Sequence, residues 1–323
     1  MHNQPMSPFR DILALDLDNT VADTFAPNSK GVGVEEACAG AVYRIFGDEG
    51  QIAFRAIGGL QNRAPGEFIR ELVSRMHLDT SFRNCLDYVE RRYSSLEKLV
   101  PKEFDLPLQY HQGSDRHDFM TEVFVRVKLE ILFAEFGSNL PGGKRWPAPM
   151  DGLAELFEAV GEVNRRVTGN QRTPIKFGIL SSGHTLFVKR CFKLWRIPKP
   201  AFIFTDDNTR GWSHLTAAER SKPNGLLLSA FIEGWSSMES GRKSGSHFDL
   251  SKLAGYKRRM LYFGDDPVKD RNLATKNGVP FFLYDPWKRV EVAPSGTAIV
   301  RSWHELAGQI RSEGEAFFHR EVW

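Results

Sequence analysis

Residues 12–20, with the sequence Ile-Leu-Ala-Leu-Asp-Leu-Asp-Asn-Thr, decide the fold that we predict for this chain. Four apolar residues lead without a break into Asp16 and Asp18, two carboxylates separated by one residue. Such a run is typical of a strand buried on both faces, and in an open α/β sheet ligands bind at the carboxyl ends of the strands. Paired carboxylates at this place suit divalent-metal binding or nucleophilic and acid/base chemistry. The alternative is a plain turn or helix cap, because Asp and Asn also bond to nearby backbone.

The composition indicates an ordinary globular protein. The chain has 323 residues, 41% of them hydrophobic, which predicts about two domains. Its 43 basic and 40 acidic residues give a net charge of only +3, so the charge does not favour a nucleic-acid partner. The three cysteines, Cys38, Cys85 and Cys191, form no CxxC pair, so we expect neither a zinc ribbon nor a disulfide framework.

The sequence also gives an expectation for the compartment. No apolar run approaches the roughly 18 residues that a membrane-spanning helix needs. The first ten residues are polar, contain two prolines and lack the basic and then apolar order of a signal peptide. We therefore expect a soluble, cytoplasmic protein without a membrane partner. The sequence leaves the oligomeric state open.

Beyond residue 150, apolar strands alternate with amphipathic helices, which predicts a parallel sheet covered on both faces. The predicted strands are Ile12–Leu17, Ile175–Leu180, Ala201–Phe204, Met260–Phe263, Val279–Leu283 and Thr297–Val300. The predicted helices are Leu153–Val167, one that ends near Leu194, one that ends near Asn277 and Gly278, and His304–Ile310. The first strand belongs to this sheet although a long helical block separates it from the others.

We interpret the helical block as an insertion after the first strand. Its predicted helices are Val34–Phe46, Pro65–Met76, Phe82–Leu99 and Phe119–Phe136, and the Pro- and Gly-rich residues 139–149 form a linker. The predicted fold class is α/β, with a Rossmann-like catalytic core made of residues 1–22 and 148–323 and an all-α cap made of residues 23–147. Residues 223–259 give a poor signal, and we expect the Ser- and Gly-rich stretch Ser236–His247 to be a surface loop.

Four stretches place polar groups at or after predicted strand ends. They are Asp16-x-Asp18-x-Thr20, Ser181 after an apolar strand, Lys222 before a proline, and Gly264-Asp265-Asp266 with Asp270 shortly behind. Each stretch is a weak signal alone. Together, in this order and on an α/β background, they form a strong one.

In this order the four stretches resemble the motifs of the haloacid dehalogenase (HAD) superfamily, and within it the phosphatases. The resemblance covers residues 11–22 and 150–310. It implies a Rossmann-like parallel sheet, a Mg²⁺ cofactor and an aspartyl-phosphate mechanism. The helical block resembles the type-one cap of that superfamily, although residues 23–147 make a larger cap than usual and the stretch 222–260 is longer than the family's connection.

The resemblance implies a role for each polar residue of the core. Asp16 is the nucleophile that attacks phosphorus, and Asp18 protonates the leaving oxygen and later takes a proton from water. Ser181 hydrogen-bonds a phosphate oxygen, and the amides of Ser182 and Gly183 open a helix toward the anion. Lys222 neutralises the charge of nucleophile and phosphate, although an exposed lysine before a turn proline is the alternative. In this superfamily an acid at the position of Asp18 marks phosphoryl transfer, and the dehalogenases lack it.

The resemblance also implies a set of Mg²⁺ ligands. Mg²⁺ prefers oxygen and commonly takes one or two carboxylates with phosphate and water. The predicted ligands are Asp16, the backbone carbonyl of Asp18, and Asp265. Either Asp266 or Asp270 supplies a further ligand or orients a bound water, and the spacing leaves open which one does so. A helix cap is an equally good interpretation of Asp266.

In the predicted cap, the stretch Gly58-Gly59-Leu60-Gln61-Asn62-Arg63 is similar to the specificity loop of such caps. It makes Asn62 and Arg63 candidate substrate contacts, with a surface position at a helix start as the alternative. The predicted function is Mg²⁺-dependent hydrolysis of a small phosphorylated metabolite. Two alternatives stay open: a phosphomutase on the same scaffold, and a non-catalytic binding protein, which the complete set of core polar residues disfavours.

Overall fold

The computed structural model describes residues 9–59, 65–78, 98–99, 116–167, 173–209, 222–241 and 252–320. The described residues divide into two compact units. One unit takes the residues up to Asp23 and those from Ala148 on, and the other runs from Thr24 to Pro147. No helix in these ranges is long and apolar enough to cross a membrane.

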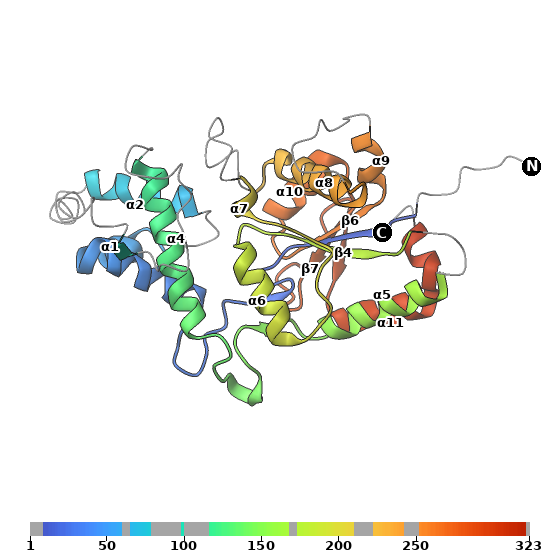
Figure 1. The fold of residues 1–323 in the computed structure, drawn as a ribbon, viewed down its shortest axis with the longest axis horizontal. Coiled ribbons are helices and arrows are strands. Elements are labelled where there is room, and N and C mark those ends of the chain that lie inside the picture. Colours follow the sequence, from blue (N-terminus) through green and yellow to red (C-terminus); the bar gives the residue numbers. More distant parts are fainter. Residues whose placement is uncertain are drawn as a thin grey trace, which may run out of the picture. The chain divides into compact units, whose positions relative to one another are not determined.

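The first unit is built on a six-stranded sheet in which every pair of neighbours is parallel (Figure 1). The parallel α/β sheet predicted from the sequence is therefore confirmed. In their order across the sheet the strands are β5 (Phe202–Phe204), β4 (Lys176–Leu180), β1 (Ile12–Leu15), β6 (Met260–Gly264), β7 (Phe281–Tyr284) and β8 (Thr297–Val300).

Strand β1 lies in the middle of the sheet because its residues are apolar on both sides. It pairs with β4 on one edge and with β6 on the other, and all four of its side chains are buried. Ile12 and Ala14 belong to the apolar cluster on one face, and Leu13 and Leu15 alternate with them. A strand covered on both faces cannot show polar alternation, which explains its unbroken apolar run.

Helices cover both faces of the sheet (Figure 1). On one side lie α5 (Leu153–Val167) and α11 (Trp303–Glu313), which pack against each other, and on the opposite side lie α8 (Gly225–Glu239), α9 (Leu253–Arg258) and α10 (Lys269–Asn277). The remaining elements of this unit are β2 (Ala22–Asp23), which pairs with β3 (Ala148–Pro149), α6 (Thr185–Trp195), α7 (Asp206–Thr209) and the 3₁₀ helix η7 (Gly314–His319). Aromatic stacking supports the α5–α11 face, where the Tyr284 and Trp303 rings lie 4.2 Å apart.

Helix α8 is absent from the sequence prediction, and the predicted surface loop is wrong for residues 236–239, which form the last turn of this helix. Asn224 caps its start by accepting the N–H of Leu226 at 3.0 Å. Phe231 and Trp235 are fully buried and lie so close to Gly178 of β4 that a Cβ there would come within 2.7 Å of either ring. The glycine therefore lets the helix approach the sheet closely.

The second unit is helical among its described residues. Its elements are α1 (Val34–Ala56), α2 (Pro65–Leu78), α4 (Arg116–Ala134) and the 3₁₀ helix η4 (Pro141–Gly143). Helix α1 continues past its predicted end, because the chain bends at Gly47, whose φ is 76°, and then resumes a helical path. The Phe54 and Phe68 rings meet edge to face, and the Phe68 ring lies tilted against that of Phe124, so the three rings join the three helices. The predicted helix Phe82–Leu99 lies almost wholly outside the described residues.

Candidate active site

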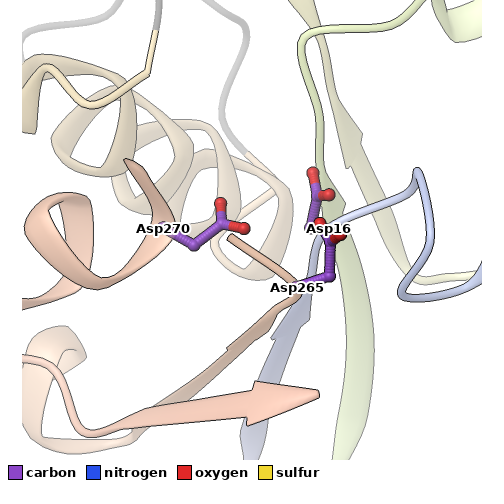
Figure 2. A group of neighbouring side chains, drawn as sticks. All are labelled: Asp16, Asp265 and Asp270. Carbon is purple, nitrogen blue, oxygen red and sulfur yellow. The ribbon is translucent and has the colours of Figure 1, made fainter. Parts of the chain in front are cut away.

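Three carboxylates gather at the carboxyl edge of the sheet (Figure 2). Asp16 follows β1, Asp265 follows β6, and Asp270 reaches back from the first turn of α10. One oxygen from each lies within 4.8 Å of the other two. Strands β1 and β6 are neighbours, and the backbone N–H of Asp16 still donates to the Phe263 carbonyl at 2.8 Å. The sheet itself therefore holds the first two carboxylates together.

Lys222 lies between two of these carboxylates. Its Nζ donates to Asp16 Oδ1 at 2.5 Å and to Asp270 Oδ1 at 2.9 Å. The lysine side chain is only 7% exposed, so water screens these two ion pairs little. The structure thus brings together Asp16, Lys222 and Asp270, which are separated by as many as 254 residues of sequence (270 − 16 = 254).

The pKa values show how crowded the site is. Burial raises the pKa of Asp16 well above its ordinary value, Lys222 acts in the opposite direction, and the other carboxylates add to the rise. Burial alone would lower the pKa of Lys222, but the carboxylates of Asp16 and Asp270 outweigh it and raise the pKa. Burial and the charge of Asp270 raise the pKa of Asp265 to about 7. Asp16 and Asp270 share one buried ammonium, and Asp265 lies 3.3 Å from the exposed Arg289. The three neighbouring carboxylates could therefore take a further cation.

The side chain of Asp266 bonds to the backbone and not to the carboxylate group. Its Oδ1 accepts the backbone N–H groups of Val268 and Lys269, both at 2.8 Å, at the turn that leads into α10. Asp270, one helical turn later, points into the carboxylate group. The sequence spacing left a choice between these two acids. The geometry places Asp270 in the carboxylate group, whereas Asp266 bonds to the backbone of the turn before α10, whose N-cap residue is Val268.

Asp18 and the residues after it form a tight turn. The Leu17 carbonyl accepts the N–H groups of Val21 and Ala22, at 2.9 and 2.8 Å. Asn19 has a φ of 56°, which Asn tolerates better than most residues. Asp18 is half-buried, and its charge contributes to the raised pKa of Asp16. The turn therefore keeps both carboxylates near one edge of the sheet, although they are only one residue apart.

Ser181 follows β4, the other neighbour of β1. The register pairs Leu15 with Ile179, so Asp16 is level with Leu180 and Ser181 lies one residue beyond it. The Ser181 hydroxyl accepts the Gly183 N–H at 2.9 Å, while Ser182 and Gly183 are half-buried. This loop therefore has a fixed shape at the same edge of the sheet.

The start of α6, directly after this loop, has an acidic partner that the sequence prediction missed. Asp207 accepts the Thr185 N–H at 2.8 Å and contacts His184 Nδ1 at 3.0 Å. The carboxylate comes from α7, after the neighbouring strand β5. It anchors the start of α6, so the loop that carries Ser181 is held from both ends.

Two further residues of the site also escaped the sequence prediction. The Tyr262 hydroxyl donates to Asp270 Oδ1 at 2.7 Å, and Arg289 Nη2 donates to the Asp265 carbonyl and Oδ2, at 3.0 and 3.3 Å. Asp285 follows β7, and its Oδ1 accepts a hydrogen bond from Arg289 Nε at 3.3 Å. The sequence contains a pointer to this arginine, because Asp285 is another carboxylate at a strand end and such a group commonly pairs with a nearby cation. The predicted substrate contacts Asn62 and Arg63 lie outside the described residues.

Gly264 leaves the space that Asp270 occupies, and this gives a prediction. A Cβ on Gly264 would lie 2.3 Å from Asp270 Oδ2 and 2.7 Å from its Cβ, so Gly264→Ala must displace that side chain. We expect the substitution to lower the free energy of unfolding by about 1–3 kcal/mol, as overpacking commonly does. Chemical denaturation measures this change.

Gly308→Ala is the matched control. Gly308 lies in α11, and a Cβ there would meet no atom within 4 Å. Alanine favours helix over glycine by about 0.5–1 kcal/mol, so this variant should be as stable as the parent or slightly more so. Equal stability of Gly264→Ala and the parent would contradict the close approach of Asp270.

The chain resembles known proteins in structure but not detectably in sequence. No protein-family model matches the chain, and no curated protein matches it in sequence. Among solved structures, CbbY from Rhodobacter sphaeroides in complex with phosphate is 13% identical, with a TM-score of 0.47, over 92% of this chain and 96% of that one.

Two more solved structures are similar, with lower TM-scores. A HAD-superfamily hydrolase of subfamily IA from Geobacter sulfurreducens is 12% identical, with a TM-score of 0.41, over 96% of this chain and all (100%) of that one. The 2-haloacid dehalogenase from Pseudomonas syringae is 15% identical, with a TM-score of 0.41, over 94% of this chain and 98% of that one.

Proposed function

We propose that this chain is a HAD-type, Mg²⁺-dependent phosphomonoester hydrolase that acts on a small phosphorylated metabolite through an aspartyl-phosphate intermediate. The observation that carries the proposal is the buried contact of Lys222 with Asp16, beside two further carboxylates at the carboxyl edge of the sheet. Phosphoryl transfer depends mainly on positioning and on neutralising charge, and this arrangement supplies both.

The residues fit a Mg²⁺ ion by their chemistry. The candidate ligands Asp16, Asp265 and Asp270 offer hard carboxylate oxygens within 4.8 Å of one another, and no softer ligand belongs to this group. Asp16 and Asp270 share the single charge of Lys222, and Asp265 has only the exposed Arg289 as a cationic partner among the described residues. When bound, Mg²⁺ would draw negative charge from the phosphate oxygens. The backbone carbonyl of Asp18 remains a proposed fourth ligand.

The chain's own residues then account for two chemical steps. Lys222 holds Asp16 Oδ1, so the second carboxylate oxygen is the one that attacks phosphorus and forms the aspartyl phosphate. Asp18 gives its proton to the leaving alkoxide. In the second step Asp18 takes a proton from a water molecule, which attacks phosphorus and breaks the bond to Asp16. The Ser181 hydroxyl and the amides of Ser182 and Gly183 are proposed to hold the phosphate oxygens.

The dehalogenase reaction is the nearest alternative on this type of scaffold. Dehalogenation needs a nucleophilic carboxylate but no general acid for an alkoxide. Asp18 lies close enough for its charge to raise the pKa of Asp16, and the HAD resemblance associates an acid at this position with phosphoryl transfer. Asp18 therefore favours the phosphatase.

We also propose that residues 23–147 form a cap that selects the ester, with Asn62 and Arg63 as candidate substrate contacts. Interactions with the remote part of a substrate change which ester reacts and leave the attack on phosphorus to the core residues. In this proposal the cap determines which ester is bound, and the site carboxylates carry out the reaction at phosphorus.

A screen of phosphate esters tests the proposed function. Nucleotides, phosphoglycolate and sugar phosphates are incubated with the purified chain and Mg²⁺, and free phosphate is measured. Hydrolysis should stop with a chelator and return when Mg²⁺ is added in excess. Isomerised sugar phosphate without free phosphate would identify a phosphomutase instead. Full activity in the chelator would refute the metal site.

The metal site gives a second test with its own control. Asp265→Ala should raise the Mg²⁺ concentration for half-maximal activity at least about tenfold, because a carboxylate is lost from the site. Asp266→Ala removes the neighbouring acid, which accepts the N–H groups of Val268 and Lys269. It should cost about 1 kcal/mol of stability, as for a lost hydrogen bond, and leave the Mg²⁺ requirement within about threefold. Activity assays at varied Mg²⁺ concentration measure this requirement, and calorimetric titration with Mg²⁺ measures the binding of the ion to each variant without substrate. The reverse ranking of the two would assign the site to Asp266.

A further inference from the structure

Tyr262 is a buried polar residue that no step of the proposed mechanism uses. It lies in β6, two residues before Gly264, and its side chain is 0% exposed. Its face of the sheet is the one covered by α8 and α10, where it belongs to an apolar cluster with Leu273 and Leu283. A hydroxyl in such surroundings needs a hydrogen-bond partner, because leaving it without one costs free energy.

The partner that it finds is a carboxylate of the site. The Tyr262 hydroxyl donates to Asp270 Oδ1 at 2.7 Å, and the same oxygen accepts Lys222 Nζ at 2.9 Å. Lys222 Nζ also lies 5.5 Å from the centre of the Tyr262 ring. A continuous chain of contacts therefore runs from Tyr262 through Asp270 and Lys222 to Asp16, where the lysine donates at 2.5 Å.

This chain of contacts fixes the direction in which Asp270 points. Asp270 is 2% exposed, so water does not hold its carboxylate. Its Oδ2 accepts the Asp266 N–H at 3.2 Å, a longer bond than the one that Tyr262 makes to Oδ1. Tyr262 is thus the neutral donor that keeps Oδ1 turned toward Lys222. Without that donor, Lys222 would be the only described donor to Oδ1 and would be drawn from Asp16 toward Asp270.

We propose that Tyr262 is a positioning residue that acts through Asp270 to hold the Lys222 ammonium against Asp16. It touches no reacting atom. Its effect on turnover rests on the proposed hydrolase function, since Lys222 matters to the rate only if Asp16 is the nucleophile. Its effect on the place of Lys222 does not rest on that function.

Tyr262→Phe tests the proposal, because it removes the hydroxyl and keeps the ring in its cluster. We expect kcat to fall about tenfold to a hundredfold, as for the loss of a hydrogen bond to a charged group, with KM within about threefold. Tyr284→Phe is the matched control, since Tyr284 is also a buried tyrosine of the same sheet, but it stacks on Trp303. Its kcat should stay within about twofold of the parent.

A second measurement reports on Lys222 without any substrate. In protein labelled with ¹⁵N-lysine, a buried and paired ammonium gives its own NMR signal, which Lys222→Met identifies by its loss. This signal should shift or broaden in Tyr262→Phe and stay in place in Tyr284→Phe. Thermal denaturation of each variant shows that it is folded.

The outcomes separate the proposal from the proposed function. A kcat loss together with a shifted Lys222 signal supports both. A shifted signal in a chain that hydrolyses no ester of the screen supports the placement of Lys222 and refutes the hydrolase. An unchanged Lys222 signal with kcat close to the parent value overturns the proposal, and a lower melting temperature alone would make Tyr262 a packing residue.

Discussion

Asp16→Asn should lower kcat by at least about a thousandfold while the chain stays folded, the loss that is typical when one member of a catalytic set is removed. The amide has nearly the same shape as the carboxylate but is a much poorer nucleophile. The fold should tolerate it, because burial raises the pKa of Asp16 and the charged carboxylate is therefore costly in the native state. Lys222 keeps its second partner, Asp270.

The measurement is single-turnover hydrolysis of the best ester from the screen, combined with mass spectrometry of acid-quenched protein. The parent should carry a phosphoryl group on the peptide that contains Asp16, and the variant should not. Asp151→Asn is the control, since this carboxylate belongs to the same unit and its side chain is 77% exposed. Activity of Asp16→Asn above about a thousandth of the parent would exclude Asp16 as the nucleophile.

Lys222→Met should lower kcat by about a hundredfold to a thousandfold, which is the usual cost of removing one preorganised electrostatic contact at a reacting group. Methionine fills a similar volume and carries no charge. The variant leaves Asp16 and Asp270 buried without their cation, and breaking a buried pair commonly costs about 3–5 kcal/mol of stability. Lys276→Met, at an exposed lysine of α10, is the control and should change neither quantity.

The stability loss in Lys222→Met should grow as the pH rises. Lys222 lowers the pKa of Asp16, so its removal pushes that pKa further above the unfolded value. The folded state then binds more protons than the unfolded state above the ordinary carboxyl pKa of about 4, and stability falls with rising pH in that range. The difference in melting temperature between parent and variant should therefore be larger at pH 8 than at pH 5. A difference that is independent of pH would contradict a buried, charged pair.

The sequence by itself determined the sheet and the place of its chemistry. The unbroken apolar run of residues 12–15 predicts a strand covered on both faces, and the structure places it between β4 and β6. Because the carboxyl ends of parallel strands share one edge of the sheet, the sequence places Asp16 and Asp265 at the same edge. They lie close together because β1 and β6 are neighbours, which the tertiary structure decides. Local signals also gave the helix stop at Gly278, which has a φ of 65°.

Helix α8 has a helical pattern in the sequence that the prediction lacks. Asn224 caps a run in which Leu227, Leu228, Phe231 and Trp235 recur at helical spacing. The serines and glycines of residues 236–247 mask this pattern, because they are typical of a loop. Burial of that apolar face against β4, which Gly178 permits, stabilises the helix.

Only the tertiary structure decided which side chains meet. Asp266 and Asp270 are both acids after the same strand, and their spacing does not separate them. The difference comes from the turn at 265–268, which bends Asp266 onto its own helix, and from Gly264, which leaves room for Asp270. Tyr262 joined the site for a similar reason, because its role depends on a contact with Asp270 that strand periodicity does not predict. Such contacts are set by packing over distances of a few ångströms, whereas the sequence pattern fixes only the face and the edge on which a residue lies.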